Sequence, residues 1–366
     1  MTADPAANPV PHDVVAALDY ERYARQRLPA GVWAYIAGAG ADGLTRRWNR
    51  EAFDSRRLSG RVLADMSGAS TATTLLGAPL PFPILLAPVA HQKLAHPDGE
   101  LATVIAASAC AAWMTVSTLA NATLEDIADA SQTTLWFQLY MQAERKETLS
   151  LVRRAEAAGY KALVVTVDAS VNGVRNDEQR AGFRMPPHVR PVNVEGFKAP
   201  VSRAGPGESP VFKGLLDSAP TWADIDWLRN ETALPILIKG IVSPKDAERA
   251  IAAGMNGIIV SNHGGRTLDT LPASLDALEA VAARVERRVP LLLDGGVRRG
   301  TDVLKALAVG ASAVMIGQPI MHALAVAGAV GVLHLLTILR AELEAAMALT
   351  GCATIADIDR DVLWPN

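Results

Sequence analysis

The chain has 366 residues, 50% hydrophobic and 20% charged, so it is long enough to bury a large core. Its formal net charge is −3, and the charge pattern contains no basic block that would indicate a nucleic-acid-binding or anionic-membrane-binding surface. Two cysteines, Cys110 and Cys352, support neither a disulfide framework nor a thiolate metal site, and we predict no metal centre. The first residues, MTADPAANPVPHDVV, lack the basic segment and apolar run of a signal peptide, so we expect a cytoplasmic protein.

The first 80 residues precede the repeating part of the chain. They contain helical patterns at 14–28 and 31–40 and a hairpin pattern around Arg57–Met66. We expect this N-terminal extension to form a helical cap over the bottom or the rim of the fold that follows.

Eight apolar, β-rich runs follow, with helical patterns between them. Most are apolar almost continuously, as in strands that are covered on both faces. Eight such units predict an α/β fold, a (β/α)8 TIM barrel formed as one domain over residues 1–366, with its active site at the carboxyl ends of the strands. An open doubly wound sheet is the alternative, although no GxGxxG follows the first run. The runs are 83–90, 113–118, 135–140, 162–168, 235–240, 257–262, 290–296 and 313–318.

Two long segments lie outside this simple alternation. Residues 185–221, after the fourth strand, are rich in Pro and Gly, and we predict that they form a lid over the barrel mouth. Residues 320–339 carry no formal charge over about the length of a membrane span. Because this run contains histidines and glycines and continues into the charged RAELEAAM, we predict one or two buried helices and no membrane helix.

Polar residues collect where the predicted strands end. In a parallel barrel these ends meet at one rim, so the set indicates an active site, although each residue alone has an ordinary structural explanation. The stretch SNHGGRTLDT, residues 261–270, places His263 and Arg266 on a glycine-rich turn and pairs a proton acceptor with an anion-binding group. The strand-end residues are Gln138, Tyr140, Thr166, Asp168, Lys239, Ser261, Asn262, His263, Arg266, Asp294, Gly317 and Gln318.

A phosphate site is predicted beside them. LLLDGGVRRG, residues 291–300, places two glycines and two arginines between a strand and a helix. The loops after the seventh and eighth strands of such barrels frequently bind phosphate through backbone N–H groups. The phosphate belongs either to the substrate or to a cofactor, and an ordinary glycine-rich turn remains the alternative.

Over nearly its whole length the chain resembles the FMN-dependent L-2-hydroxy acid oxidases and dehydrogenases, the family of glycolate, lactate and mandelate oxidases. ARQRLPAGVWAYIAGAGAD, LAPVAHQKLAHPDGE, WFQLY, ILIKGI and LLLDGGVRRGTDVLKALAVGA carry the resemblance, and SNHGGR with a following LD is its most specific part. The resemblance implies FMN as the cofactor, a small 2-hydroxy carboxylic acid as the substrate, and oxygen or another compound as the electron acceptor. It also implies a homotetramer.

The resemblance implies a role for each matching residue. His263 corresponds to the active-site base and Asp168 to the carboxylate that binds it. The substrate-binding residues are Arg175 and Arg266, which hold the carboxylate, with Tyr35 and Tyr140 as hydroxyl partners. The residues around the flavin ring are Ala90, Ser117, Gln138, Thr166 and, beside flavin N1, Lys239. The ribityl and phosphate residues are Asp294, Gly296, Arg298, Gly317 and Gln318.

These residue types suit the oxidation of a 2-hydroxy acid to a 2-oxo acid. A histidine can accept a proton at neutral pH, and a neighbouring carboxylate orients its ring. Two arginines give a fixed grip on a carboxylate, and a lysine offers positive charge where a reduced flavin becomes anionic.

The chain departs from the family pattern at three informative places. GQP replaces the usual GRP, so Gln318 removes a cation from the phosphate site; Arg298, together with Arg299, must carry more, and we expect weaker FMN retention. ASVNGVR replaces TPRLGRR but keeps Arg175. Leu119 stands where some oxidases of small acids have Trp, so we expect the pocket to accept medium-chain or aromatic 2-hydroxy acids.

Three alternative functions remain at this point. The first is an FMN-dependent isomerase-type barrel that acts on a phosphorylated substrate. The second is a flavin-free aldolase with Lys239 as the Schiff-base nucleophile. The third is an inactive flavin-binding relative, in which GQP and ASVNGVR reflect the loss of activity.

Overall fold

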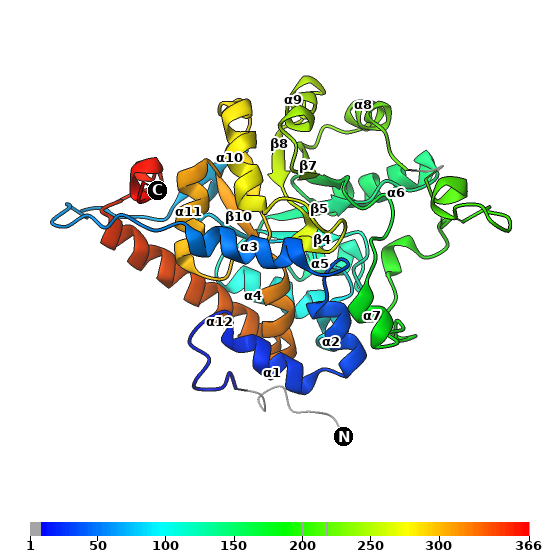
Figure 1. Ribbon diagram of the computed structural model, residues 1–366, viewed down its shortest axis with the longest axis horizontal. Coiled ribbons are helices and arrows are strands. Elements are labelled where there is room, and N and C mark those ends of the chain that lie inside the picture. Colours follow the sequence, from blue (N-terminus) through cyan, green and yellow to red (C-terminus); the bar gives the residue numbers. More distant parts are fainter. Residues whose placement is uncertain (1–8, 200, 217–218, 366) are drawn as a thin grey trace.

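The computed structural model describes residues 9–199, 201–216 and 219–365. Eight parallel strands close into a barrel in the order β10-β3-β4-β5-β6-β7-β8-β9, with helices around it (Figure 1). All eight predicted strands are present, so the (β/α)8 prediction is confirmed and the open sheet is wrong. The barrel strands are β3 (Ile84–Leu86), β4 (Met114–Ser117), β5 (Leu135–Leu139), β6 (Leu163–Thr166), β7 (Ile236–Ile241), β8 (Gly257–Val260), β9 (Leu291–Leu293) and β10 (Ala313–Ile316).

Helices connect successive strands on the outside of the barrel. The connecting helices are α4 (Gly99–Ala109), α5 (Leu124–Asp129), α6 (Arg145–Ala157), α7 (Asn176–Arg180), α8 (Trp222–Glu231), α9 (Pro244–Ala252), α10 (Ser274–Val285) and α11 (Gly300–Val309). Short 3-10 turns are η1 (Gln92–Leu94), η2 (Val192–Val194), η4 (His263–Gly265), η5 (Ile355–Asp357) and η6 (Arg360–Val362), and η3 (Val211–Leu215) is a π-helical turn.

Alternation along the strands divides the apolar side chains into two layers. One set packs inside the barrel and includes Leu85, Trp136, Val164, Leu237 and Met315. The other set, with Leu86 and Phe137 among its members, packs against the surrounding helices. Both faces of each strand are therefore apolar, which explains the nearly continuous apolar runs in the sequence.

The N-terminal extension contributes to both the cavity and the barrel interior. Helices α1 (Asp19–Arg27), α2 (Ala30–Ala37) and α3 (Leu44–Ser55) come first, and residues of α2 and α3 line the cavity described below. A hairpin of β1 (Thr73–Leu75) and β2 (Ala78–Leu80) follows, and Leu75 and Leu80 pack into the interior cluster of the barrel.

The predicted hairpin around Arg57–Met66 is wrong. No strand lies in that segment, and Val62 and Leu63 are exposed. The actual hairpin turns at Leu76 and Gly77, both with positive φ, and buries an apolar residue on each strand. Within 57–66 only an isolated bridge from Leu58 to Leu363 forms, and Val62 and Leu63 have no core to cover.

The apolar run 320–339 lies in α12 (Gln318–Thr350), which passes beside α1, α4 and α11. Its helical backbone is interrupted at Ala327 and Gly328. In length and composition α12 alone among the described helices could cross a membrane, but 61% of its most apolar window is buried in the protein. That burial is the behaviour of a core helix, as predicted.

The long segment 185–221 follows α7. Its first part packs beside the barrel: Val189 and Asn193 are buried, and the backbone oxygen of Arg190 accepts a hydrogen bond from Asn121. None of the described residues of this segment lines the cavity. The lid function of 185–221 stays a prediction.

Candidate active site

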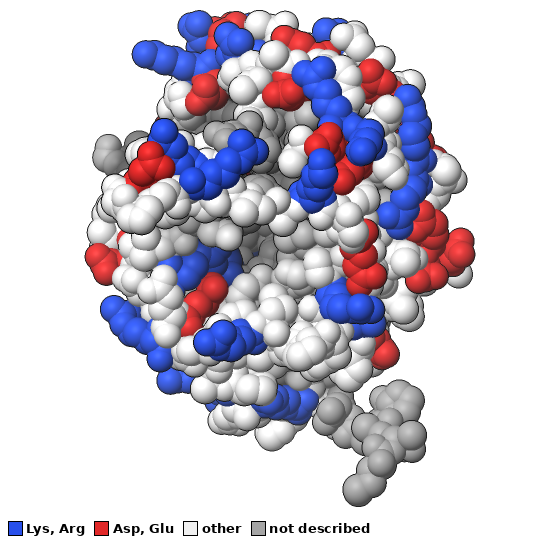
Figure 2. Space-filling model, turned by 90° about the vertical axis from the view of Figure 1, so that its right-hand side faces the viewer, with Lys and Arg blue, Asp and Glu red and all other residues white. Residues whose placement is uncertain are grey.

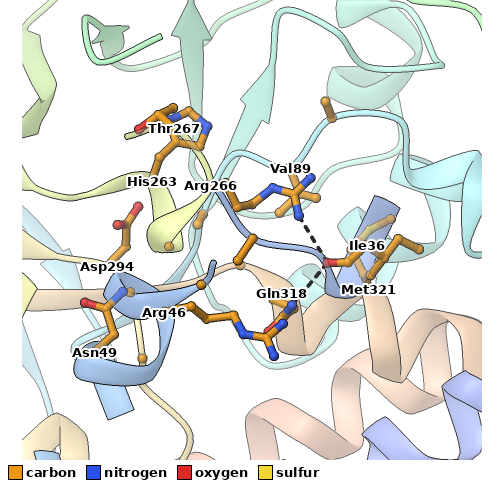
Figure 3. Close-up of a pocket in the computed structure, with 18 of the residues that line it drawn as sticks. Ile36, Arg46, Asn49, Val89, His263, Arg266, Thr267, Asp294, Gln318 and Met321 are labelled. Atoms are coloured by element: carbon orange, nitrogen blue, oxygen red, sulfur yellow. Dashed lines mark hydrogen bonds between the residues drawn. The ribbon is translucent and has the colours of Figure 1, made fainter. Parts of the chain in front are cut away.

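A cavity of about 880 Å³ opens at the carboxyl ends of the barrel strands (Figure 3). The face of the molecule in Figure 2 mixes acidic and basic side chains around a central hollow, without a patch of one sign. Asp168, one of the predicted site residues, does not line the cavity; it lies behind His263. The predicted residues that line it are Tyr35, Ala90, Ser117, Gln138, Tyr140, Thr166, Arg175, Lys239, His263, Arg266, Asp294, Gly296, Arg298, Gly317 and Gln318.

His263 is held in a fixed orientation directly after β8. Its backbone has a positive φ of 57°, its N–H donates to Ser261 Oγ at 3.0 Å, and Nδ1 lies 2.9 Å from Asp168 Oδ1. Gly240 permits this approach, because a Cβ there would lie 2.6 Å from the Asp168 side chain. Since an ionised carboxylate only accepts hydrogen bonds, Nδ1 carries the proton and Nε2 is left as the acceptor.

The charge state of Asp168 agrees with this arrangement. Burial works against its ionisation, but the charge of His263 and the hydrogen bond to it outweigh burial and lower the pKa of Asp168. The carboxylate therefore stays ionised and stabilises a protonated His263 ring.

Arg175 and Arg266 come together through Glu178. Arg175 Nη1 lies 2.9 Å from Glu178 Oε1, and Arg266 Nη2 lies 3.6 Å from the same oxygen. Arg266 also donates to the Gly38 carbonyl at 2.8 Å, and its guanidinium stacks over the Tyr35 ring at 5.3 Å. Glu178 was missed from the sequence, where an acidic residue three positions after Arg175 is typical of a solvent-exposed helical ion pair.

The two tyrosines beside these arginines are hydrogen-bond donors at neutral pH. Burial raises the pKa of Tyr140 to about 12 and also raises the pKa of Tyr35. Both hydroxyl groups therefore keep their protons while facing the cavity.

Lys239 lies at the floor of the cavity between two acidic groups. Its side chain is 4% exposed, Nζ lies 2.8 Å from Asp294 Oδ2, and Nζ donates to Ser261 Oγ at 2.9 Å. Burial opposes its positive charge, but Asp294 and Asp168 prevail and raise the pKa of Lys239. The amine is thus a cation and not the neutral nucleophile that a Schiff-base aldolase needs. Ser261 links it to His263, because the same hydroxyl accepts from the His263 backbone.

The other end of the cavity is formed by the loops after β9 and β10. Gly295 and Gly296 have φ of 94° and 86°, and a Cβ on Gly296 would lie 2.6 Å from the Asn49 carbonyl oxygen. Arg298 Nη2 donates to Gln318 Oε1 at 2.7 Å, and Gln318 Nε2 donates to the Ile36 carbonyl at 3.1 Å. Arg299 was expected to share the charge here, but its guanidinium binds Glu342 at 3.2 Å and does not line the cavity.

The chain is similar in sequence and in fold to known oxidases. A family model described as FMN-dependent dehydrogenase matches residues 24–365. The chain belongs to the FMN-dependent dehydrogenase family. It is 49% identical over 358 residues to L-lactate oxidase of Alicycliphilus denitrificans, covering 98% of each chain, and 43% identical over 356 residues to glycolate oxidase 1 of Oryza sativa subsp. indica, covering 97% and 96%. A structure of mandelate oxidase with benzoyl-formic acid superposes with a TM-score of 0.87 at 39% identity, covering 96% of this chain and 98% of that one.

FMN, the cofactor of this dehydrogenase family, fits the polar groups that the cavity leaves without partners. Gln138 Nε2, Thr166 Oγ1 and Asp294 Oδ1 are buried with no hydrogen-bond partner among the described residues. Buried polar groups are nearly always hydrogen-bonded, so these three indicate a polar ligand. Gln138 and Thr166 would hold the flavin ring, Asp294 the ribityl chain, and the Gly296–Arg298 loop the phosphate.

His91 follows the cavity residue Ala90 in the chain but does not itself line the cavity. Its side chain is buried, and its ring centroid lies 6.4 Å from that of Tyr35. Burial lowers the pKa of His91, so the ring is neutral. Among the described residues, no cluster of His, Cys, Asp and Glu is arranged to hold a metal ion.

Proposed function

We propose that the protein oxidises an L-2-hydroxy acid to the 2-oxo acid with FMN and passes the electrons to oxygen, which forms hydrogen peroxide. The observation that carries this proposal is the His263–Asp168 pair at 2.9 Å, in one cavity with two arginines. A base that faces an anion-binding pair matches a substrate with a hydroxyl group next to a carboxylate. The relatives named above act as oxidases of lactate, glycolate and mandelate, which supports the same reaction class.

Each polar group has a part in the proposed reaction. Arg175 and Arg266 bind the substrate carboxylate, with the Tyr35 and Tyr140 hydroxyls beside it, and this fixes which face of the α-carbon is presented. His263 Nε2 takes the hydroxyl proton as the carbonyl group forms. When bound, FMN would accept the two electrons that the α-carbon loses together with its hydrogen. Lys239 places a positive charge in the wall of the flavin site, and Asp168 stabilises the protonated His263.

The substrate side chain is proposed to be medium-chain or aromatic. Leu119, half-buried, lines the cavity together with Val89 and Tyr35. Leucine fills less volume than the Trp found there in some oxidases of small acids, which leaves room for a larger group. A panel of glycolate, L-lactate, L-2-hydroxyhexanoate and L-mandelate tests this: a strict preference for glycolate contradicts it.

The central experiment mixes the FMN-loaded protein with each acid under anaerobic conditions and then admits air. We expect the visible absorbance of the bound flavin to bleach with the true substrate. Fast return of colour in air supports oxygen as the acceptor, and slow return indicates another acceptor. No bleaching by any 2-hydroxy acid supports the inactive-relative alternative.

An isomerase-type activity on a phosphorylated substrate is the second candidate, and the cavity favours it less. The pairing of Arg175 and Arg266 through Glu178 suits a carboxylate beside the base. In addition, the residues at the phosphate end are accounted for by FMN phosphate.

We further propose that the protein is a cytoplasmic homo-oligomer, a tetramer as the family resemblance implies. The exposed apolar side chains Ile105 on α4 and Val330 on α12 support an interface there, because α4 and α12 pack against each other. Sedimentation equilibrium at low micromolar concentration tests the oligomeric state, and a monomer contradicts it.

A further inference from the structure

The phosphate end of the cavity contains an arginine that the strand ends do not supply. Arg46 comes from α3 in the N-terminal extension, yet it lines the same cavity as Arg298, Gly296 and Gln318. In Figure 3 its side chain extends from α3 toward Gln318. The predicted phosphate site was drawn from the loops after β9 and β10 alone, so Arg46 was missed.

Two neighbouring carbonyl groups hold Arg46 and Gln318 next to each other. Arg46 Nη1 donates to the Ala37 carbonyl, and Gln318 Nε2 donates to the Ile36 carbonyl at 3.1 Å. Gln318 Oε1 in turn accepts from Arg298 Nη2 at 2.7 Å. The adjacent carbonyls of Ile36 and Ala37 therefore hold Gln318 and Arg46 side by side, and the Gln318 amide in turn holds Arg298.

The start of α3 is fixed by the loop that carries His263. The Asp269 carboxylate accepts hydrogen bonds from the backbone N–H groups of Asp42, Leu44 and Thr45 at 3.1, 3.2 and 2.8 Å. Acidic groups stabilise a helix N-terminus, where the backbone N–H groups have no partner within the helix. The backbone of Arg46, the next residue, therefore has a defined position, and its exposed side chain is held by the bond to the Ala37 carbonyl.

Arg46 and Arg298 differ from the other arginines nearby in having only neutral partners. Arg50 binds the Asp302 carboxylate at 2.6 Å and Asp54 at 2.7 Å, and Arg299 binds Glu342. Within the described part of the chain, no carboxylate oxygen lies within 4.0 Å of the guanidinium nitrogens of Arg46 or Arg298. Two positive charges kept near each other without a counter-ion are suited to an anionic ligand.

Two other titratable groups near the phosphate end, His322 and Glu21, do not add a positive charge for an anion. His322 is buried and stacks on Trp33 at 5.4 Å, and burial, followed by the charges of Arg298 and Arg46, lowers its pKa to about 3. It is therefore neutral and adds no cation. Glu21 of α1 lines the outer part of the cavity, and its charge opposes an anion there.

We propose that Arg46 is the second phosphate-binding cation; this proposal rests on FMN as the cofactor. Arg46 would supply the positive charge that an arginine at position 318 gives in a GRP sequence and that Gln318 lacks. Gln318 keeps a positioning role: its amide holds Arg298 against the end of α2. Two cations then face the phosphate, as in a site with GRP, although one comes from the helical cap. We accordingly expect ordinary FMN retention and not the weak retention that GQP alone suggested.

The test compares FMN with riboflavin, which lacks the phosphate, on the flavin-depleted full chain. We expect Arg46→Leu to raise the FMN dissociation constant, measured by quenching of flavin fluorescence, by about tenfold to hundredfold, since a hydrogen bond to a charged group has this effect. Riboflavin affinity should stay within about twofold of the wild type. Arg299→Leu is the matched control, because it removes one positive charge near the same loop from a residue bound to Glu342; we expect no change in FMN affinity.

Comparing Arg46→Leu with the double variant tests whether Arg46 substitutes for an arginine at position 318. Introducing Gln318→Arg into Arg46→Leu should restore most of the lost FMN affinity. Unchanged FMN affinity in Arg46→Leu overturns the proposal, as does an equal loss for FMN and riboflavin, which indicates a structural role. If Gln318→Arg does not restore FMN binding, the idea that Arg46 substitutes for an arginine at position 318 is wrong. Because the readout is flavin binding alone, these outcomes are independent of whether a 2-hydroxy acid bleaches the flavin.

Discussion

The two ends of the cavity differ in whether their charged side chains are paired with groups of opposite charge. At the substrate end the charged groups are paired inside the protein: His263 with Asp168, Lys239 with Asp294, and Arg175 and Arg266 with Glu178. At the phosphate end Arg298 and Arg46 contact neutral oxygens only. One end is largely neutralised before a ligand arrives, and the other is not.

The difference matches the charges of the proposed ligands. Two arginines and one glutamate leave a net charge of +1 at the substrate end, which one carboxylate balances. Arg298 and Arg46 contribute +2 at the phosphate end, which Glu21 of the same cavity partly offsets, and a phosphate monoester carries about −1.5 to −2 at neutral pH. A cofactor that must stay bound and a substrate that must leave each turnover thus meet different amounts of uncompensated charge.

His263→Ala should have the largest effect of the changes at the paired end. Loss of the base is expected to lower the rate of anaerobic flavin bleaching by about 10²-fold to 10⁴-fold, the usual contribution of a positioned base. FMN affinity should not change, because the phosphate end is untouched. Bleaching at a near-normal rate would show that His263 is not the base.

Arg175→Lys should have the next largest effect. A lysine keeps the charge but loses the planar two-point grip, so we expect kcat/KM to fall by about tenfold to hundredfold, mainly through KM. Steady-state peroxide formation with the best acid of the panel measures this. An unchanged KM would place the carboxylate elsewhere in the cavity.

Glu178→Gln changes the charge balance of the paired end while keeping an oxygen for Arg175. The net charge rises from +1 to +2, so a dianionic competitor such as oxalate should gain affinity over a monoanionic 2-oxo acid by about fivefold, the effect of a charge contact of on the order of 1 kcal/mol. Competitive inhibition constants for the two anions check this. An unaltered ratio would mean that Glu178 does not set the charge of the site.

The smallest of these effects should be that of Asp168→Asn on stability against acid, although the same change should also slow flavin bleaching because Asp168 orients His263. The folded-state pKa of Asp168 lies below its usual value of 3.8, so the folded protein gains stability from this carboxylate above that value and loses it as the pH falls further. We expect the difference in unfolding free energy between wild type and variant to be fully present at pH 7 and to shrink as the pH falls below 3.8. Urea titrations across this range measure it; a difference independent of pH would contradict the assigned ion pair.

The sequence predicted the barrel because its strands are buried on both faces, and the resulting apolar runs can be recognised without tertiary information. It misplaced the hairpin, since Val62 and Leu63 resemble strand residues but only Leu75 and Leu80 have a core to enter. The residues around SNHGGR were predicted from strand ends and from the family resemblance, and they line one cavity.

Glu178 and Arg46 could not be predicted in the same way. Both are charged residues on helices, and that pattern is typical of a solvent-exposed face. Their significance comes from contacts between distant parts of the chain, such as the bonds of Arg46 and Gln318 to adjacent carbonyls of α2. Local sequence carries no record of such proximity.

The bond between Gln318 and the end of α2 spans 282 positions of the chain. During synthesis the cap helices leave the ribosome first, but their partners at the phosphate end are among the last parts of the barrel to be made. The phosphate end of the cavity is complete only when both the cap and Gln318 have been made. The protein is therefore expected to capture its flavin only after translation of the last strand, so that newly made chains pass through a cofactor-free state whose cap is still undocked.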